Sequence, residues 1–156
     1  MNDSIAARVA ELGMSLPAAP SPAANYVPYI VTGTLAYISG QLPIKDGTVV
    51  HLGHAGDGVA LEEGYASTRL CALNVVAQVA AAVGDRLSRV KRCVNMTVFV
   101  NAIPEFADHP QIANGATDLV VEIFGDAGRP TRAAVGVSSL PRGALTEVQA
   151  VFEIEP

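Results

Sequence analysis

The sequence predicts an α+β fold, in which a mixed β-sheet has two long helices packed on one face. Two stretches, residues 61–83 and 109–124, repeat apolar side chains with the period of a helix. Short runs of β-branched and aromatic residues precede, separate and follow these stretches, and they indicate strands. With 156 residues the chain can bury a core without disulfides. We expect an N-terminal helix and Pro-rich tether over residues 1–24, and a single domain over residues 25–156.

The N-terminal segment predicts a short helix and an extended connector. Apolar side chains over residues 4–12 repeat on one face, and Gly13 follows where a helix can end. Pro17, Pro20 and Pro22 then favour an extended chain without regular hydrogen bonds. We expect the helix to lie on the surface of the domain and the connector to tether it to the sheet.

Residues 26–33 and 35–40 predict a first β-hairpin with a tight turn between its strands. Residues 49–52 form a candidate edge strand ahead of a Gly-rich loop. His51 and His54 make an HxxH pair, but no third ligand stands at a recognisable spacing. We therefore interpret both as loop histidines.

The middle of the chain predicts a helix, a strand and a second helix. Gly84 follows the first helix at the position where glycine ends helices. Residues 90–101 alternate in polarity and predict a central strand with one core face and one mixed face. For the second helix we expect Asp108 to be the N-cap and Gly125 to mark the end.

Asn114 and Gly115 stand in the first half of the second helix, where both are weak helix formers. They indicate a kink, a close approach of another segment or a ligand contact. A tolerated irregularity of the helix explains them equally well.

Residues 129–137 and 145–154 flank a Pro/Gly turn and predict a second hairpin. Folding the chain back would bring Arg132 and Glu147 together. An arginine can hold a carboxylate by two parallel hydrogen bonds, and a nearby glutamate can orient or deprotonate a water. The pair therefore predicts a site for a small acid, with an ordinary cross-strand ion pair as the alternative.

The sheet face without helices needs cover. We expect it to present Ala134, Gly136 and the outer face of the central strand, and to form a subunit interface. Half of the residues are apolar and 16% are charged, a composition that favours burial of part of the surface in an oligomer.

The net charge of −5 is a poor match for a polyanion, so we expect no nucleic-acid partner. One basic cluster stands where the first long helix gives way to the central strand, and we interpret it as a solvated helix end that complements the helix dipole. Its members are Arg86, Arg89, Lys91 and Arg92.

The N-terminus lacks the pattern of a signal peptide, and no window suggests a membrane span. Cys71 and Cys93 match no disulfide or metal-binding spacing, so we expect reduced, buried thiols. These features predict a cytoplasmic protein without a membrane partner.

Several short motifs stand in order along residues 25–154. Tyr26 precedes Ser39-Gly40-Gln41, and Thr97-Val98-Phe99-Val100 lies in the central strand. Arg132 then begins the spacing R-x(7)-LP-x(5)-E, which ends at Glu147. Together these motifs resemble the Rid (YjgF) family of enamine/imine deaminases. The resemblance implies a chorismate-mutase-like fold, a homotrimer with a small-molecule cleft between subunits, and no metal or organic cofactor.

The resemblance also implies an enzyme activity, the hydrolytic deamination of small 2-enamino or 2-imino acids such as 2-aminoacrylate to 2-keto acids and ammonia. Arg132 would hold the substrate carboxylate, and Glu147 would position or activate the attacking water. Tyr26 would close the cleft, Asn114 would match the family's helix asparagine, and Ala134 would lie near the ligand.

The sequence departs from the family pattern at several points. Residue 134 is Ala where some members have Cys, and Gln149 stands where many have a second Glu. The N-terminal extension and the loop over residues 51–58 resemble those of a longer subgroup, and either can reshape the cleft.

Other interpretations remain open for this site. An interface arginine, an ion-paired glutamate and a packed tyrosine are the structural alternatives for Arg132, Glu147 and Tyr26. The alternative function is non-catalytic or regulatory binding of a keto acid or another small carboxylate in the same cleft. An endoribonuclease role, a label attached to some relatives, fits poorly with the net charge.

Overall fold

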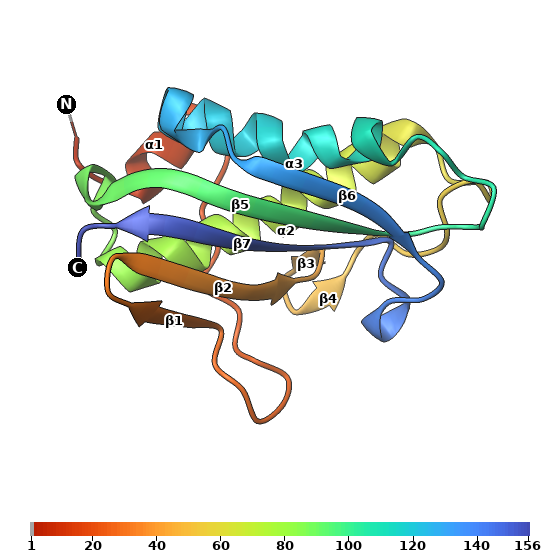
Figure 1. The fold of residues 1–156 in the computed structure, drawn as a ribbon, viewed down its shortest axis with the longest axis horizontal. Coiled ribbons are helices and arrows are strands. Elements are labelled where there is room, and N and C mark those ends of the chain that lie inside the picture. Colours follow the sequence, from red (N-terminus) through yellow and green to blue (C-terminus); the bar gives the residue numbers. More distant parts are fainter. Residues whose placement is uncertain (1) are drawn as a thin grey trace.

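The computed structural model describes residues 2–156 and has the predicted α+β architecture (Figure 1). Five strands form a mixed sheet in the order β1-β2-β7-β5-β6, and the long helices pack on one of its faces. A separate two-stranded ribbon, β3-β4, lies beside it. The elements are α1 (Ile5–Glu11), β1 (Tyr29–Thr32), β2 (Leu35–Gln41), β3 (Ile44–Lys45), β4 (Thr48–Val49), α2 (Leu61–Val83), η1 (Leu87–Arg89), β5 (Val90–Asn101), α3 (His109–Phe124), η2 (Gly125–Gly128), β6 (Thr131–Val137), η3 (Pro141–Gly143) and β7 (Thr146–Ile154).

Both long helices have the predicted bounds. Gly84 ends α2 in the left-handed conformation with φ 65°, which a residue without a side chain adopts at low cost. Gly125 ends α3 as expected. Asp108 is the N-cap residue of α3, as predicted, but its carboxylate makes no capping hydrogen bond and its backbone (φ −97°, ψ 31°) is not extended as in a typical N-cap.

The N-terminal extension is docked on the domain. Ser4 caps α1 by accepting a hydrogen bond from the Ala7 backbone N–H, and Ile5 and Val9 are fully buried. The helix therefore lies on the surface of the domain, as expected, and its two buried side chains anchor it in the core. The tether that follows is fixed by the buried Gln78, whose Nε2 donates to the Pro20 carbonyl oxygen over 2.7 Å.

The first hairpin is confirmed, because β1 and β2 pair antiparallel. The second is wrong. β6 pairs parallel with β5, while β7 pairs antiparallel with β5 on its other side and with β2. Residues 138–145 cross the end of β5, a longer path than a tight hairpin turn needs. The candidate edge strand at residues 49–52 is reduced to β4, which pairs only with β3.

The two faces of the sheet differ as the central strand predicts. Met96, Val98 and Val100 of β5 face the helices and have no exposed surface. Parallel pairing sets Ala134 of β6 beside Val98, so Ala134 packs against the core and is not part of the open face.

Gly136 also faces the helix layer, because a side chain there would meet the His109 ring. The expectation that Ala134 and Gly136 lie on the uncovered face is therefore wrong. Ala133 and Val135, which lie beside Thr97 and Phe99, occupy that face instead. Successive side chains of a strand point to opposite faces of the sheet, so an error of one residue in the expected position moves a side chain to the other face.

Helix α2 is long and apolar enough to cross a membrane by length and composition alone, so the expectation that no window suggests a span is wrong. In the fold, 67% of its apolar window is buried. The helix packs between β7, β2 and α3, and this position accounts for its composition.

The basic cluster forms a solvated helix end, as predicted. Arg89 donates to the carbonyl oxygen of Val83 in the last turn of α2, over 3.0 Å, and to that of Glu155. Lys91 and Arg92 lie 2.7 and 3.7 Å from carboxylates of Glu155 and Glu153.

Both cysteines are free and buried, as predicted. Burial raises the pKa of Cys93 to about 12 and that of Cys71 further, so neither thiol is ionised at neutral pH.

Gly115 marks a close approach of the two long helices, one of the interpretations open from the sequence. A Cβ at this position would lie 2.5 Å from Thr68 Oγ1 and closer still to the carbonyl oxygen of Tyr65 in α2. Since that oxygen belongs to a helical backbone, it cannot move away independently.

We expect Gly115→Ala to destabilise the protein by about 1–3 kcal/mol, the usual cost of overpacking, and to lower the melting temperature by several degrees. Gln111→Ala, at an exposed position of the same helix, is the control and should leave the melting temperature nearly unchanged. An unaltered transition for the Gly115 variant would contradict the close packing of α2 on α3.

Candidate functional site

The predicted site residues lie in two separate groups. Arg132, Asn114 and Ala134 are on the edge formed by β6 and α3. Glu147 and Tyr26 line a cavity at the other side of the sheet. Within one chain the structure thus places the predicted residues in two regions that lie apart.

Helix α3 fixes the Arg132 guanidinium. Its Nη1 donates to Asn114 Oδ1 over 2.8 Å and to Thr117 Oγ1 over 3.1 Å. Asn114 therefore orients Arg132, a more specific role than the sequence predicted for it. Thr117 was not found from the sequence, although its place one helical turn after Asn114 is a usable signal.

The arginine keeps part of its hydrogen-bonding capacity. Among residues 2–156, neither Nε nor Nη2 of Arg132 has a hydrogen-bond partner. These two nitrogens form one edge of the planar guanidinium, and such an edge matches the two oxygens of a carboxylate. The side chain is exposed beside a shallow cavity of ≈ 240 Å³.

Glu147 is half-buried near the start of β7 and packs against Gly40. A Cβ on Gly40 would lie 2.9 Å from Glu147 Cδ and closer to Oε1, so only glycine leaves this space open. The register of β2 against β7 shifts between Ile38 and Gln41, which places Gly40 in a bulge. The Ser39-Gly40-Gln41 motif therefore makes room for the carboxyl group.

Burial raises the pKa of the Glu147 carboxyl. In the part of the chain that the structure describes, no cation forms an ion pair with it. The folded state therefore loses stability as pH rises from the ordinary pKa of the group to its raised value. The same shift favours exchange of a proton with a substrate nearer to neutral pH.

The cavity beside Glu147 has a volume of ≈ 240 Å³. The Pro-rich tether forms one wall, so the extension shapes the candidate cleft. Tyr26 contributes to this wall and is about half exposed, so it is not the packed aromatic of the structural alternative. The lining residues are Pro20, Ser21, Pro22, Ala23, Tyr26, Pro28, Gly40, Gln41, Leu42, Ile44, Pro141, Arg142 and Glu147.

Arg132 and Glu147 cannot hold one small acid within a single chain. Arg132 lies beside Met96 on the helix-facing side of β6, and Glu147 lies opposite Phe99 on the other face. Two strand spacings and three residues separate their backbones by about 14 Å. The prediction that folding the chain back brings them together is therefore wrong, as is the cross-strand ion pair.

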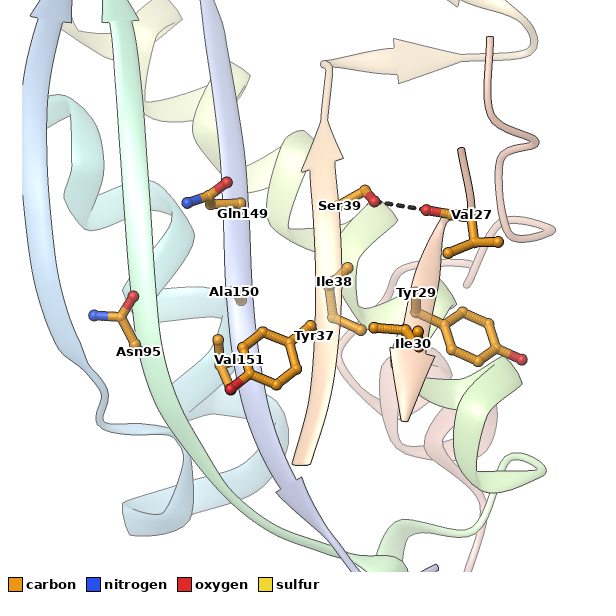
Figure 2. A pocket seen from close by; sticks show the side chains of 10 residues that line it. All are labelled: Val27, Tyr29, Ile30, Tyr37, Ile38, Ser39, Asn95, Gln149, Ala150 and Val151. Carbon is orange, nitrogen blue, oxygen red and sulfur yellow. Dashed lines mark hydrogen bonds between the residues drawn. The ribbon is translucent and has the colours of Figure 1, made fainter. Parts of the chain in front are cut away.

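The uncovered face of the sheet holds a groove of ≈ 230 Å³ (Figure 2). Tyr37 and Val151 lie side by side there, with Asn95 and Gln149 farther along the same face. Ile30 and Tyr37 are 58% and 44% exposed, which is high for large apolar and aromatic side chains in a monomer. This groove continues the sheet face on which Glu147 lies.

His51 and His54 lie in a loop and have different surroundings. Nδ1 of His51 lies 3.7 Å from Glu63 Oε1. His54 instead lines a cavity that His109 and Gly136 also line. Among residues 2–156 there is no group of three or more side chains suited to bind a metal ion.

Gly40→Ala tests whether burial against Gly40 sets the Glu147 pKa. The added methyl should displace the carboxyl toward solvent, and its pKa should fall toward the ordinary value of about 4.3. Carbon-detected NMR titration of the side-chain carboxyl, assigned with Glu147→Gln, measures the change. Glu155, whose carboxylate pairs with Lys91 far from Gly40, should titrate alike in both proteins, and an equal titration of Glu147 in both would refute this packing effect.

A family model described as "YjgF/chorismate_mutase-like, putative endoribonuclease" matches residues 6–154. Protein TCP17 of Trypanosoma cruzi is 48% identical over 151 residues, which cover 96% of this chain and 94% of that protein. The RutC family protein y4sK of Sinorhizobium fredii is 32% identical, covering 87% and 92%. A protein of Dermatophagoides farinae named 2-iminobutanoate/2-iminopropanoate deaminase is 29% identical, covering 91% and 95%.

Solved structures share the whole fold. Atu1372 of Agrobacterium tumefaciens matches with a TM-score of 0.90 and 40% identity, covering 98% of this chain and 94% of that one. A Shewanella oneidensis protein described as a "putative endoribonuclease" matches with a TM-score of 0.91 and 34% identity, over 97% of this chain and 99% of that one. TdcF of Escherichia coli with bound serine matches with a TM-score of 0.64 and 27% identity, over 88% of this chain and 94% of that one. The chorismate-mutase-like fold is thereby confirmed, and the chain belongs to the YjgF/RutC family.

Proposed function

We propose that this protein hydrolyses small 2-enamino or 2-imino acids to 2-keto acids and ammonia, without a cofactor, in clefts between the subunits of a homotrimer. The observation that supports it most is the half-buried Glu147 carboxyl with its raised pKa, held against Gly40 in a cavity of a YjgF/RutC chain. A proton-exchanging group beside a small cavity suits hydrolysis of a C=N bond.

The reaction needs little beyond positioning and proton transfer. Water adds to the electrophilic imine carbon and one of its protons passes to the imine nitrogen, which gives a carbinolamine. The proton of the new hydroxyl then passes to the amino group as the C–N bond breaks and the C=O bond forms, releasing ammonia and the keto acid. Glu147 would orient the water, accept its proton and return a proton to the departing nitrogen. Burial raises the pKa of this carboxyl above its ordinary value, which brings proton exchange closer to neutral pH.

Arg132 would hold the substrate carboxylate. Asn114 and Thr117 occupy Nη1, which leaves the Nε and Nη2 edge for two parallel hydrogen bonds to the substrate. Ala134, two residues along the same side of β6, would leave space next to the ligand. Tyr26 would cover the cavity beside Glu147.

The separation of Arg132 from Glu147 supports a site shared by two subunits. A neighbouring copy would bring the edge of its β6 and α3 to the Glu147 cavity. The exposed apolar groove gives such a copy a surface to pack on. A closed trimer would form three identical clefts of this kind.

Two relatives support a small acid as the ligand. The Dermatophagoides farinae protein is named for the deamination of 2-iminobutanoate and 2-iminopropanoate, and the TdcF structure contains serine. A nucleic acid fits less well. Arg86, Arg89, Lys91 and Arg92 already contact carboxylates or backbone carbonyl oxygens, so this cluster is not a free basic patch.

The activity is measured by adding the protein to a threonine or serine dehydratase and following keto-acid release. The wild type should accelerate release, and Arg132→Ala and Glu147→Gln should each lower kcat/KM by about 100-fold or more, through loss of the carboxylate contact and of proton transfer. Arg92→Ala removes an exposed arginine that pairs with Glu153 and lines neither the Arg132 cavity nor the Glu147 cavity, and it should keep wild-type activity.

No acceleration by the wild type would refute the proposed reaction. Binding of 2-oxobutanoate without turnover would instead favour the non-catalytic alternative.

Mixed oligomers test whether the site is shared. Arg132→Ala and Glu147→Gln subunits are unfolded together and refolded, and light scattering gives the mass of the product. About one quarter of wild-type activity should return, because in random trimers one site in four receives both intact residues. Each variant refolded alone is the control. A mixture as inactive as its components would place both residues in one subunit.

A further inference from the structure

The Glu147 cavity is lined by a cation of the same chain, Arg142, which has no ion-pair partner among residues 2–156. We propose that Arg142 binds a distal carboxylate of the substrate, so that the preferred substrates are dicarboxylic 2-imino acids of four or five carbons. This inference rests on the proposed deaminase function and assigns its substrate class.

Arg142 is free to bind an anion. It lies in η3, in the connection between β6 and β7, and its guanidinium makes one long hydrogen bond, from Nη2 to the Gly47 carbonyl oxygen at 3.4 Å. Within residues 2–156 it has no ion-pair partner. An arginine with so few partners retains most of its donors for a ligand.

The backbone at Arg142 is held in an unusual conformation. Its φ is 59°, which a residue with a long side chain adopts only at a cost. Gly143, the next residue, and Gly47, whose carbonyl oxygen accepts the hydrogen bond from Arg142, also have positive φ. Such conformations persist where the surrounding structure fixes them, and they are enriched at ligand sites.

The space next to Glu147 continues past Arg142. The cavity of ≈ 240 Å³ that contains Glu147 and a second of ≈ 460 Å³ share Pro20, Ser21, Ile44 and Arg142 as lining residues. Arg142 therefore lies where the two spaces join. A substrate that carried only a methyl or ethyl group would leave this junction without a contact to the cation.

The remaining polar groups limit where a second anion can bind. Asp46 lines the far cavity, and its negative charge disfavours a carboxylate deeper than Arg142. Asn74 also lines the far cavity, but its Nδ2 already donates to the carbonyl oxygens of Leu42 and Ile44. Arg142 is thus the cation that lines both spaces.

The tether closes this space on one side. Pro20 and Ser21 line both cavities, and the bond from Gln78 fixes the chain at Pro20. A rigid wall opposite a cation selects ligands by length and charge together. The N-terminal extension would in this way restrict substrates to those that reach Arg142.

The experiment compares imines made in place by amino-acid oxidases from aspartate or glutamate with the imine made from alanine. Ammonia release gives kcat/KM for wild type, Arg142→Gln and Arg142→Lys. The wild type should prefer the dicarboxylic imines about tenfold or more, Arg142→Gln should lose most of that preference through a higher KM, and Arg142→Lys should retain part of it. Arg92→Gln, remote from the cavity, is the control.

Binding of 2-oxoglutarate and 2-oxobutanoate, followed by thermal stabilisation of the same proteins, separates the two hypotheses. Tighter binding of 2-oxoglutarate that depends on Arg142 supports the anion site even if no imine is hydrolysed, in which case the deaminase function alone would fail. Hydrolysis of the alanine imine, with no preference and no effect of Arg142→Gln on either measurement, would overturn the proposed substrate class and leave the deaminase function intact.

Discussion

Strand β7 lies between β2 and β5, and hydrogen bonds along both of its edges fix the order of the sheet. Its alternate side chains from Thr146 to Ile154 are buried against the helices. The outer side of β5 is taken by β6, which follows α3 in the chain and pairs in parallel. The connection after β6, residues 138–145, then crosses the end of β5 to begin β7. The two strands that follow one another in sequence thus lie on opposite sides of a third.

This strand order has a chemical consequence. In a hairpin, the Arg132 guanidinium beside Glu147 would lower the pKa of the carboxyl and leave it permanently ionised. Because the two residues lie apart in the fold, Asn114 and Thr117 orient the arginine, and the carboxyl keeps a pKa raised by burial. In the proposed reaction each group has a different part, and the proposed shared site would use a neighbouring subunit to bring the two together.

The N-terminal extension has an equally direct effect on the candidate cleft. Buried side chains of α1 and the bond from Gln78 to Pro20 fix the tether along the Glu147 cavity. Atu1372 and the Shewanella oneidensis protein match 98% and 97% of this chain, whereas TdcF matches 88% of it with a lower TM-score. The tether and Arg142 together offer a physical basis for substrate selection within a common fold.

The sequence by itself determined the fold class, the bounds of both long helices and the central strand, and the residue types of the candidate site, because periodicity and turn chemistry are local properties. Only the tertiary structure decided the partners of β6 and β7, the face on which Ala134 and Gly136 lie, and the distance between Arg132 and Glu147. Parallel and antiparallel neighbours share the same strand pattern, so their choice depends on burial across the whole sheet. The roles of Gly40, Thr117 and Arg142 were also seen only in the tertiary structure. Each depends on another element of the fold: Gly40 packs on Glu147, Thr117 accepts a hydrogen bond from Arg132, and Arg142 lines the Glu147 cavity.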